Sequence, residues 1–194
     1  MAEIDKLIPH IIKWETGVRQ LYGESLEHLF ERSRRAGYAY DPDDKGGATQ
    51  SGVTLNTYIR FRKFAGRSKP TLKDLKNITF TEWKELLVAF FWDKIHGGAI
   101  KSESVAVMIC DWYWGSGVWG LKNTQKVLGV ERDGIFGVKT LGAINKWHGG
   151  AEDLWLKLRA ERIAYYKRIA IGRQKKYLRG WLNRVNDLKY DDKE

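Results

Sequence analysis

Glu15 stands where its side chain could act as a general acid, at the end of a segment with helical periodicity. At 100° per residue, Glu15 lies roughly 20° around the helix from Ile4, on the apolar face. Partial burial and the negative end of the helix dipole both favour a carboxyl group that keeps its proton. Such a group can protonate a leaving oxygen. A solvated glutamate at a frayed helix end is the alternative. The helix is predicted from apolar residues at spacings of three and four, Ile4, Leu7, Ile8, Ile11 and Ile12.

A second group of acids follows in a turn. Asp41, Asp43 and Asp44 precede a Gly-Gly pair and lead to Thr49 and Thr54. A calcium loop is excluded by spacing, because counting from Asp41 its fifth position is a lysine and its twelfth a glycine. Three carboxylates would repel a phosphate, and an ordinary acidic turn remains an alternative. The turn residues predict a loop and small β-hairpin over 38–54.

The rest of the sequence is predicted to be mainly helical. Gly17 and Gly37 provide stops for the first two helices, and Thr79 with Glu82 resembles a capping box. Further helices are predicted over residues 24–37, 54–65, 79–94, 102–115, 151–170 and 178–188, with a compact helical stretch over 118–147.

Composition narrows the class of protein further. The 194 residues, 43% of them hydrophobic, suffice for one core with a small lobe. A net charge of +10 favours an anionic partner without selecting one. The single cysteine, Cys110, excludes an internal disulfide and is read as a buried thiol. The four histidines lack metal-ligand spacing, so neither a metal nor a cofactor is expected.

Two blocks resemble the glycoside hydrolase family 108 N-acetylmuramidases, a family that includes phage endolysin-like proteins and proteins named secretion activators. The first is Ile-Ile-Lys-Trp-Glu at 11–15, and the second is the ordered block that begins Asp-Pro-Asp-Asp-Lys-Gly-Gly-Ala-Thr and fills 41–54. Residues 106–143 resemble the family's predicted peptidoglycan-binding region through the segments 111–117, 125–130 and 133–141. The resemblance covers most of the chain.

The resemblance implies a mainly α, lysozyme-like fold with a small β-hairpin near the active site. It divides the chain into a catalytic region over 1–100 and a peptidoglycan-binding region over 101–194, packed as one compact unit. It further implies hydrolysis of the β-1,4 bond between N-acetylmuramic acid and N-acetylglucosamine in peptidoglycan glycan strands. The family's catalytic glutamate is carried onto Glu15.

One departure from the family pattern lies between the two blocks. The family's Glu-Gly-Gly-Tyr runs almost directly into the acidic block, whereas here an insertion of about residues 18–37 intervenes. Aligned without a gap, the acid would fall on Arg35, which cannot donate a proton. The insertion is read as a self-contained helix that loops out. It could narrow the cleft, act as a lid or supply a substitute acid from Glu24, Glu27 or Glu31.

Other site residues follow from the resemblance. Asp43 or Asp44 is the candidate second carboxylate, which stabilises charge on the sugar or activates water, and Thr49 orients that water. The candidates for substrate binding are Tyr40, Thr54, Asp111, Trp112, Trp114 and Trp119. Trp112 and Trp114 are two residues apart and cannot share a helix face, and core packing is the alternative for each tryptophan.

Three functional classes remain from the sequence. A muramidase is the leading hypothesis, and an inactive cell-wall-binding or secretion-associated protein on the same fold is the alternative. A nucleic-acid-binding protein is disfavoured because no binding motif is present. We expect a monomer with no transmembrane segment. The N-terminus does not resemble a secretory signal, so the protein is expected to reach the wall or periplasm from the cytoplasm by export or lysis.

Overall fold

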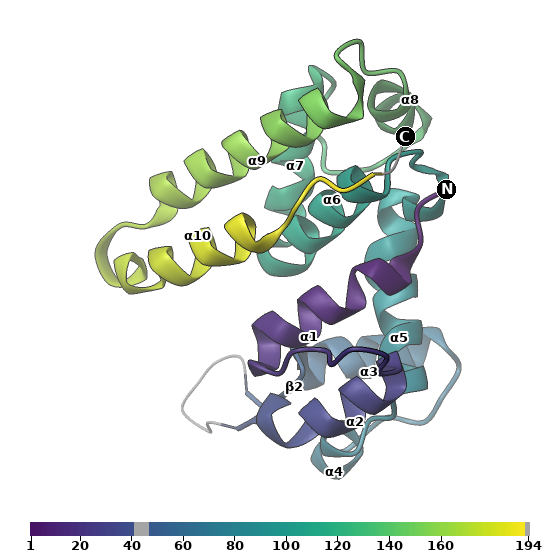
Figure 1. The fold of residues 1–194 in the computed structure, drawn as a ribbon. Helices are drawn as coiled ribbons and strands as arrows, with labels where there is room; N and C mark the ends of the chain where they lie inside the picture. The colour runs from purple at the N-terminus through teal and green to yellow at the C-terminus, as the bar shows by residue number, and fades with distance from the viewer. Residues whose placement is uncertain (41–46, 193–194) are drawn as a thin grey trace. The chain divides into compact units, whose positions relative to one another are not determined.

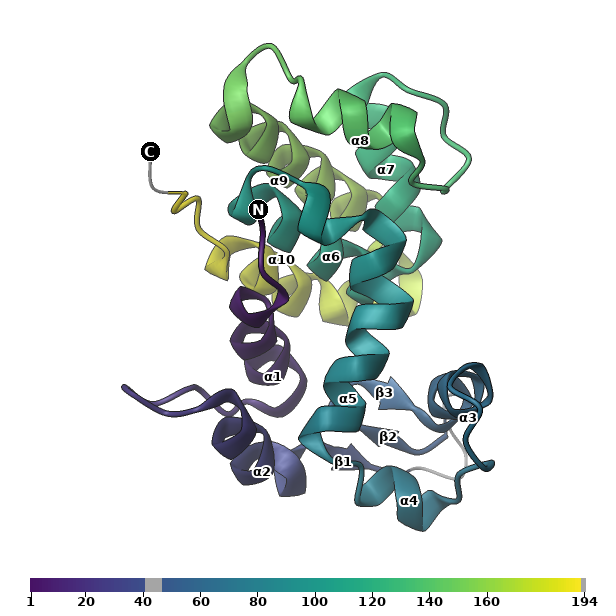
Figure 2. The same cartoon turned by 90° about the vertical axis from the view of Figure 1, so that its right-hand side faces the viewer.

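The computed structural model describes residues 1–40 and 47–192 and divides the chain into two compact units. The N-terminal unit is Ile8–Phe90, and the C-terminal unit combines Met1–Leu7 with Phe91–Glu194. Their elements are labelled in Figures 1 and 2. The N-terminal unit contains α1 (Ile8–Thr16), α2 (Leu26–Gly37), β1 (Tyr38–Ala39), β2 (Thr49–Gln50), β3 (Val53–Thr54), α3 (Leu55–Phe64), α4 (Leu72–Lys76) and α5 (Phe80–Leu87). The C-terminal unit contains α6 (Glu103–Ser116), α7 (Val118–Leu128), α8 (Val138–Asn145), α9 (Gly150–Ile169) and α10 (Leu178–Asp187).

Shorter helical turns connect these elements. A π-helical turn continues α5 and carries the chain from one unit to the other. The single turns of 3-10 helix are Ile4–Lys6, Asp93–Ile95 and Gly97–Ala99, with a longer one at Gly172–Tyr177, and the π-helical turn is Val88–Trp92. The mainly α fold with a small β element, predicted from the sequence, is confirmed.

The core of the N-terminal unit is formed by α1, α2 and α5. On the apolar face predicted for the first helix, Leu7, Ile8, Ile11 and Ile12 are buried. The α-helix begins at Ile8 rather than at Ile4, however, because Ile4–Lys6 is a 3-10 turn, so the predicted angle between Ile4 and Glu15 does not apply. Gly17 follows α1 with a φ of +77°. Such a φ is the left-handed conformation in which glycine commonly ends a helix. The Phe30 ring of α2 lies 5.3 Å from the Trp83 ring of α5 and 5.8 Å from the Phe80 ring. These contacts make the three helices one packed body.

The prediction that the inserted helix loops out is wrong. Leu29, Phe30 and Ser33 on one face of α2 are fully buried. At the end of α2, a Cβ added to Gly37 would lie 2.5 Å from Ser51 Oγ, so α2 closes tightly on the turn after β2. The spacing of the buried residues is that of an amphipathic helix with a core-facing stripe. The insertion is therefore part of the core.

The three short strands form an antiparallel sheet in the order β1-β2-β3, beside α5 in Figure 2. Tyr38 pairs with Gln50, and Thr49 pairs with Thr54. Ser51 and Gly52 connect β2 to β3 with φ angles of +46° and +80°. Positive φ at both central residues is the geometry of a tight hairpin turn. The predicted hairpin is confirmed, and one more strand pairs with it.

Two helix starts in this unit show how local polar residues fix the elements. The sequence reading missed α4, which begins with a capping box in which Thr71 and Asp74 bond each other's backbone N–H groups. Thr79 caps α5 as predicted by accepting the Glu82 N–H at 3.2 Å. The Glu82 carboxylate does not bond back. It instead accepts the Tyr58 hydroxyl at 2.6 Å.

The C-terminal unit is built around α6, which packs against α7 and α9. Helices α9 and α10 run antiparallel and side by side in both ribbon views (Figures 1 and 2). Gly120 brings α7 close to α6, since a Cβ there would lie 2.7 Å from the Trp112 backbone. Trp112, Tyr166 and Val185 form a buried cluster between α6, α9 and α10. The predicted helices of this region are confirmed.

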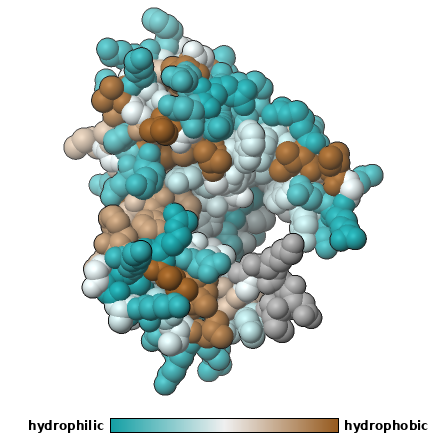
Figure 3. Space-filling view, turned by 180° about the vertical axis from the view of Figure 1, so that it is seen from behind, coloured by the Kyte–Doolittle hydropathy of each residue, from teal (hydrophilic) through white to brown (hydrophobic). Residues whose placement is uncertain are grey.

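Hydrophobic side chains are dispersed over the surface. On the face shown in Figure 3, hydrophobic residues form separate patches among hydrophilic ones. No helix in the described ranges is both apolar and long enough for a bilayer crossing.

Candidate functional site

Glu15 is the penultimate residue of α1, and its side chain is half-buried. The helix end beside it is fixed: the Thr16 hydroxyl donates to the Ile12 carbonyl at 2.7 Å and accepts the Val18 N–H at 3.1 Å. The preceding Trp14 ring lies 6.3 Å from the His10 ring. Glu15 thus places a carboxyl group, partly shielded from water, at an ordered helix C-terminus.

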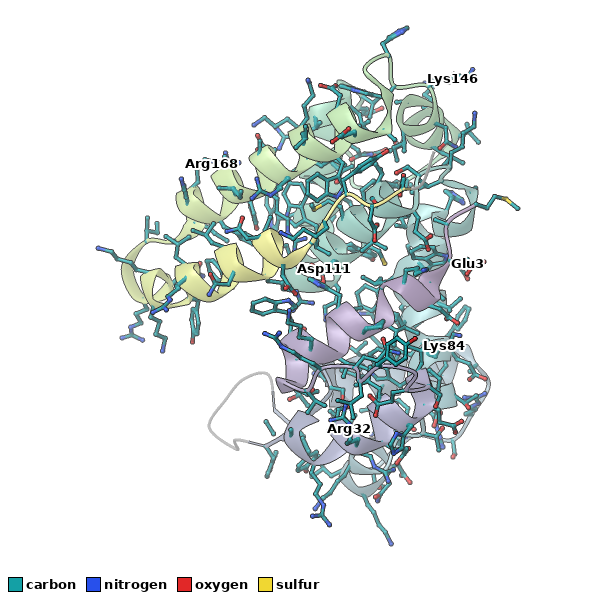
Figure 4. The ribbon with its side chains drawn as sticks, viewed as in Figure 1. Glu3, Arg32, Lys84, Asp111, Lys146 and Arg168 are labelled. Carbon is teal, nitrogen blue, oxygen red and sulfur yellow. The ribbon has the colours of Figure 1, made fainter. Side chains whose placement is uncertain are left out.

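Glu24, the first substitute acid considered, is engaged in an ion pair. Its carboxylate accepts from Arg32 Nε at 2.8 Å, Arg32 Nη2 at 2.9 Å and the Leu21 N–H at 2.9 Å. Figure 4 labels Arg32 on α2. The Arg32 hydrogen bonds, followed by that of Leu21, lower the pKa of Glu24 to about 2. A carboxyl group with this pKa is anionic near neutral pH and has no proton to donate.

The other two substitutes are no better placed. Glu31 forms an ion pair with Arg34, with Oε2 at 2.6 Å from Nη2. Glu27 is exposed in the first turn of α2. Among the glutamates considered from the sequence, Glu24 and Glu31 are therefore engaged in ion pairs and Glu27 is exposed, whereas Glu15 is half-buried.

Thr49 and Thr54 are cross-strand neighbours on β2 and β3, with Ala39 of β1 on the same face. Directly opposed residues project from the same side of a sheet. Both threonines are half-buried. The Thr54 hydroxyl accepts the Thr57 N–H at 3.2 Å and thereby caps α3, so this residue also has a structural role.

The predicted second carboxylates, Asp43 and Asp44, lie outside the described residues, and their roles stay predictions. Tyr40, which directly precedes that segment, is 53% exposed. A large aromatic side chain with half of its surface open to solvent has a free face for contact with a sugar.

Asp111 and Trp112 are core residues of the C-terminal unit. Asp111 is fully buried, and its carboxylate accepts from Arg162 at 2.7 Å and from Arg184 at 2.7 Å. The Trp112 ring is fully buried against α9 and α10. Neither side chain is open to a ligand in solvent, and their predicted contact with substrate gains no support from this position.

The two remaining tryptophans differ in exposure. Trp114 is half-buried, with its ring 4.7 Å from that of Phe91. Trp119 at the start of α7 is 54% exposed, and Lys122 Nζ lies 5.8 Å from its ring centre. Of the predicted tryptophans, Trp119 presents the most accessible face for stacking on a sugar ring.

The described residues form two cavities that were not predicted from the sequence. One, of about 350 Å³ in the N-terminal unit, is lined by Arg34, Arg35, Tyr38, Lys76 and Asn77. The pair Arg34-Arg35, two residues before Gly37, was the only signal of this cavity in the sequence, since Lys76 comes from a helix that was not predicted. The other, of about 250 Å³ in the C-terminal unit, has Lys101 and Asp192 among its lining residues, with Ile144, Trp147 and Leu154 as apolar walls.

Cys110 is buried without a disulfide, and burial raises the pKa of its thiol well above the usual value. A thiol of this kind is not a nucleophile. Among residues 1–40 and 47–192, no cluster of three or more His, Cys, Asp or Glu side chains is arranged to hold a metal ion.

Comparisons with known proteins place these features in a family. The family model described as Glycosyl hydrolase 108 matches residues 29–117, and the model described as Predicted Peptidoglycan domain matches residues 119–186. The first match begins within α2, so it contains Arg35 and leaves Glu15 outside. The boundary between the two matches falls at the turn between α6 and α7, whereas the compact units divide at Phe90.

The solved structure of Brucella abortus SagA resembles the chain along nearly its whole length. The two are 29% identical, and the match covers 94% of this chain and 89% of that one with a TM-score of 0.69. No curated protein matches the chain. With two adjoining family models over residues 29–186 and a shared fold, the chain belongs to the glycosyl hydrolase 108 family and carries a C-terminal predicted peptidoglycan domain.

Proposed function

We propose that the protein hydrolyses peptidoglycan at the β-1,4 bond between N-acetylmuramic acid and N-acetylglucosamine, with Glu15 as general acid. The observation that carries the proposal is the half-buried carboxyl group at the ordered end of α1. Glu15 gives its proton to the glycosidic oxygen as the bond from that oxygen to the anomeric carbon breaks. Asp43 or Asp44 stabilises the positive charge on the sugar or activates the attacking water, which Thr49 orients.

A binding protein without activity is the second candidate, and a specific observation favours it. The family-model match starts at residue 29, so it leaves Glu15 outside and contains Arg35, the position to which an alignment without a gap assigns the family's acid. A guanidinium group cannot serve as that acid. We favour the enzyme because Glu15 ends a helix whose sequence resembles the family's catalytic helix, and because Glu24 and Glu31 are engaged in ion pairs.

The C-terminal unit supports substrate binding in this proposal. Its predicted peptidoglycan domain includes Trp119, whose exposed ring can stack on the apolar face of a sugar. The protein acts as a monomer and reaches the wall from the cytoplasm by export or lysis.

The bond is tested by digesting purified peptidoglycan, reducing the products with borohydride and identifying the new reducing end by mass spectrometry. We expect N-acetylmuramitol at the reducing end. N-acetylglucosaminitol would contradict the proposed bond. Retention of the protein on peptidoglycan without any new reducing end would support the binding protein instead.

A further inference from the structure

We propose that the cavity lined by Arg34, Arg35, Tyr38, Lys76 and Asn77, here called the cationic cavity, binds carboxylates of the peptide stems of peptidoglycan. The inference rests on the proposed function for the identity of the polymer. It goes beyond that function in assigning a separate site to the peptide rather than to the glycan. The volume of the cationic cavity, about 350 Å³, is within the range of small-ligand pockets.

The walls of the cationic cavity are held in place by the core. The end of α2 is fixed because Gln50 Nε2 donates to the Arg34 carbonyl at 2.9 Å and the Ser51 N–H donates to the Gly37 carbonyl at 2.8 Å. Helix α4 packs on β2 and buries Leu75 completely. The backbone that carries the exposed Arg35 and Lys76 side chains is therefore fixed before a ligand arrives.

Within residues 1–40 and 47–192, the cationic cavity has more positive than negative charge. Arg34 is paired with Glu31, but no acid among the described residues forms an ion pair with Arg35 or Lys76. Lys76 Nζ lies 5.3 Å from the centre of the Tyr38 ring, so its charge is positioned above an aromatic wall. A guanidinium and an ammonium group in this arrangement suit a carboxylate ligand with an adjoining apolar group.

The chemistry of peptidoglycan identifies where such a carboxylate is found. The lactyl carboxyl group of muramic acid is consumed in the amide bond to the peptide, which leaves the glycan without it. The peptide stem carries free carboxylates and small side chains. A cationic cavity in the unit that holds Glu15 therefore fits the stem better than it fits the sugars.

The test is isothermal titration with the disaccharide-tetrapeptide N-acetylglucosaminyl-N-acetylmuramyl tetrapeptide, which lacks the bond that the proposed activity cleaves. The variant is Arg35→Ala/Lys76→Ala, and the matched control is Lys63→Ala/Lys69→Ala, which removes the same charge from exposed positions of the same unit. We expect the Kd for the disaccharide-tetrapeptide to rise about fivefold to twentyfold in the first variant, as for two lost ion pairs. The control should leave it unchanged.

Three results would overturn the inference. An equal loss of affinity for the peptide-free disaccharide would show that the cavity binds sugar. Inorganic phosphate bound through Arg35 and Lys76, with no effect of the variant on the disaccharide-tetrapeptide, would assign the cavity to a free anion. If the Arg35→Ala/Lys76→Ala variant changes only the melting temperature and not the Kd, the two charges serve to stabilise helix ends and do not bind the stem.

Failure of this inference is distinguishable from failure of the proposed function. If wild-type protein cleaves peptidoglycan and the variant binds the disaccharide-tetrapeptide normally, only the inference is wrong. If wild-type protein binds through Arg35 and Lys76 but cleaves nothing, only the enzymatic proposal is wrong.

Discussion

Oδ2 of Asp111 on α6 lies 2.7 Å from Nη2 of Arg162 on α9, and both side chains are completely buried. Arg184 of α10 adds a second contact at 2.7 Å to the other oxygen. In Figure 4, Asp111 lies on the side of α9 that faces α10, whereas Arg168 points away from α10. One carboxylate thus joins three helices of the C-terminal unit.

Replacing this carboxylate removes the charge that is paired with the fully buried Arg162 guanidinium group. We predict that Asp111→Asn lowers the free energy of unfolding by about 3–5 kcal/mol, because an unpaired buried charge has lost its hydration without compensation. Urea denaturation measures the loss. Glu131→Gln, at an exposed position of the same unit, is the control and should change stability little. A similar small effect for both variants would show that the pair contributes nothing.

Glu24 makes stability depend on pH. The pKa of Glu24 falls from 4.5 to about 2 through the hydrogen bonds of Arg32 and Leu21. A lowered folded-state pKa stabilises the fold above pH 4.5, and this contribution is lost as the pH falls toward about 2. We therefore predict that wild type exceeds Glu24→Gln in stability at pH 6 and that the difference disappears near pH 2.

Chemical denaturation at several pH values measures this difference. Glu27→Gln changes an exposed carboxyl group in the first turn of α2, the helix that carries Arg32, and serves as the control. A gap between wild type and Glu24→Gln that persists unchanged to pH 2 would mean that the ion pair with Arg32 does not account for it.

A substitution at Gly37 tests whether α2 is packed into the core. We predict that Gly37→Ala lowers the free energy of unfolding by about 1–3 kcal/mol, because the new Cβ would lie 2.5 Å from Ser51 Oγ and force a shift. Gly142→Ala in α8 is the matched control, since nothing lies within 4 Å of its Cβ, and it should be neutral or stabilising. Thermal unfolding compares them. A neutral Gly37→Ala would speak for a loosely attached helix.

Substitutions at Glu15 and Arg35 test which of these two positions carries the catalytic acid. If Glu15 is the acid, adding Arg35→Glu to Glu15→Gln will not restore release of reducing sugars from peptidoglycan. The reason is that a carboxyl group at the end of α2 stands at a different place from one at the end of α1. Restored activity in the double variant would place the acid at position 35 in the last turn of α2 and remove Glu15 from the role.

Local patterns predicted most elements, and long-range packing explains what they missed. The apolar spacing before Glu15 and the cap at Thr79 were sufficient for α1 and α5. Helix α4 has only five residues, too few for a periodic signal, and the Thr71 capping box was overlooked. The burial of α2 depends on aromatic partners about fifty residues further along the chain, which periodicity does not reveal.

The site was less predictable than the fold. The sequence suggested substrate binding for Asp111, but its two arginine partners are 51 and 73 residues away, and no spacing rule connects them. The cationic cavity likewise combines the end of α2 with an unpredicted helix. By contrast, the half-buried position of Glu15 at a helix end agrees with its sequence setting.

The central claim is that Glu15 donates the proton. The most direct measurement is the rate of reducing-sugar release from purified peptidoglycan by wild type, Glu15→Gln and the control Glu27→Gln, with melting temperatures to verify folding. We predict a loss of roughly 100-fold or more in Glu15→Gln, as expected when a general acid is removed, and full activity in Glu27→Gln. Equal rates for folded wild type and Glu15→Gln would contradict the account.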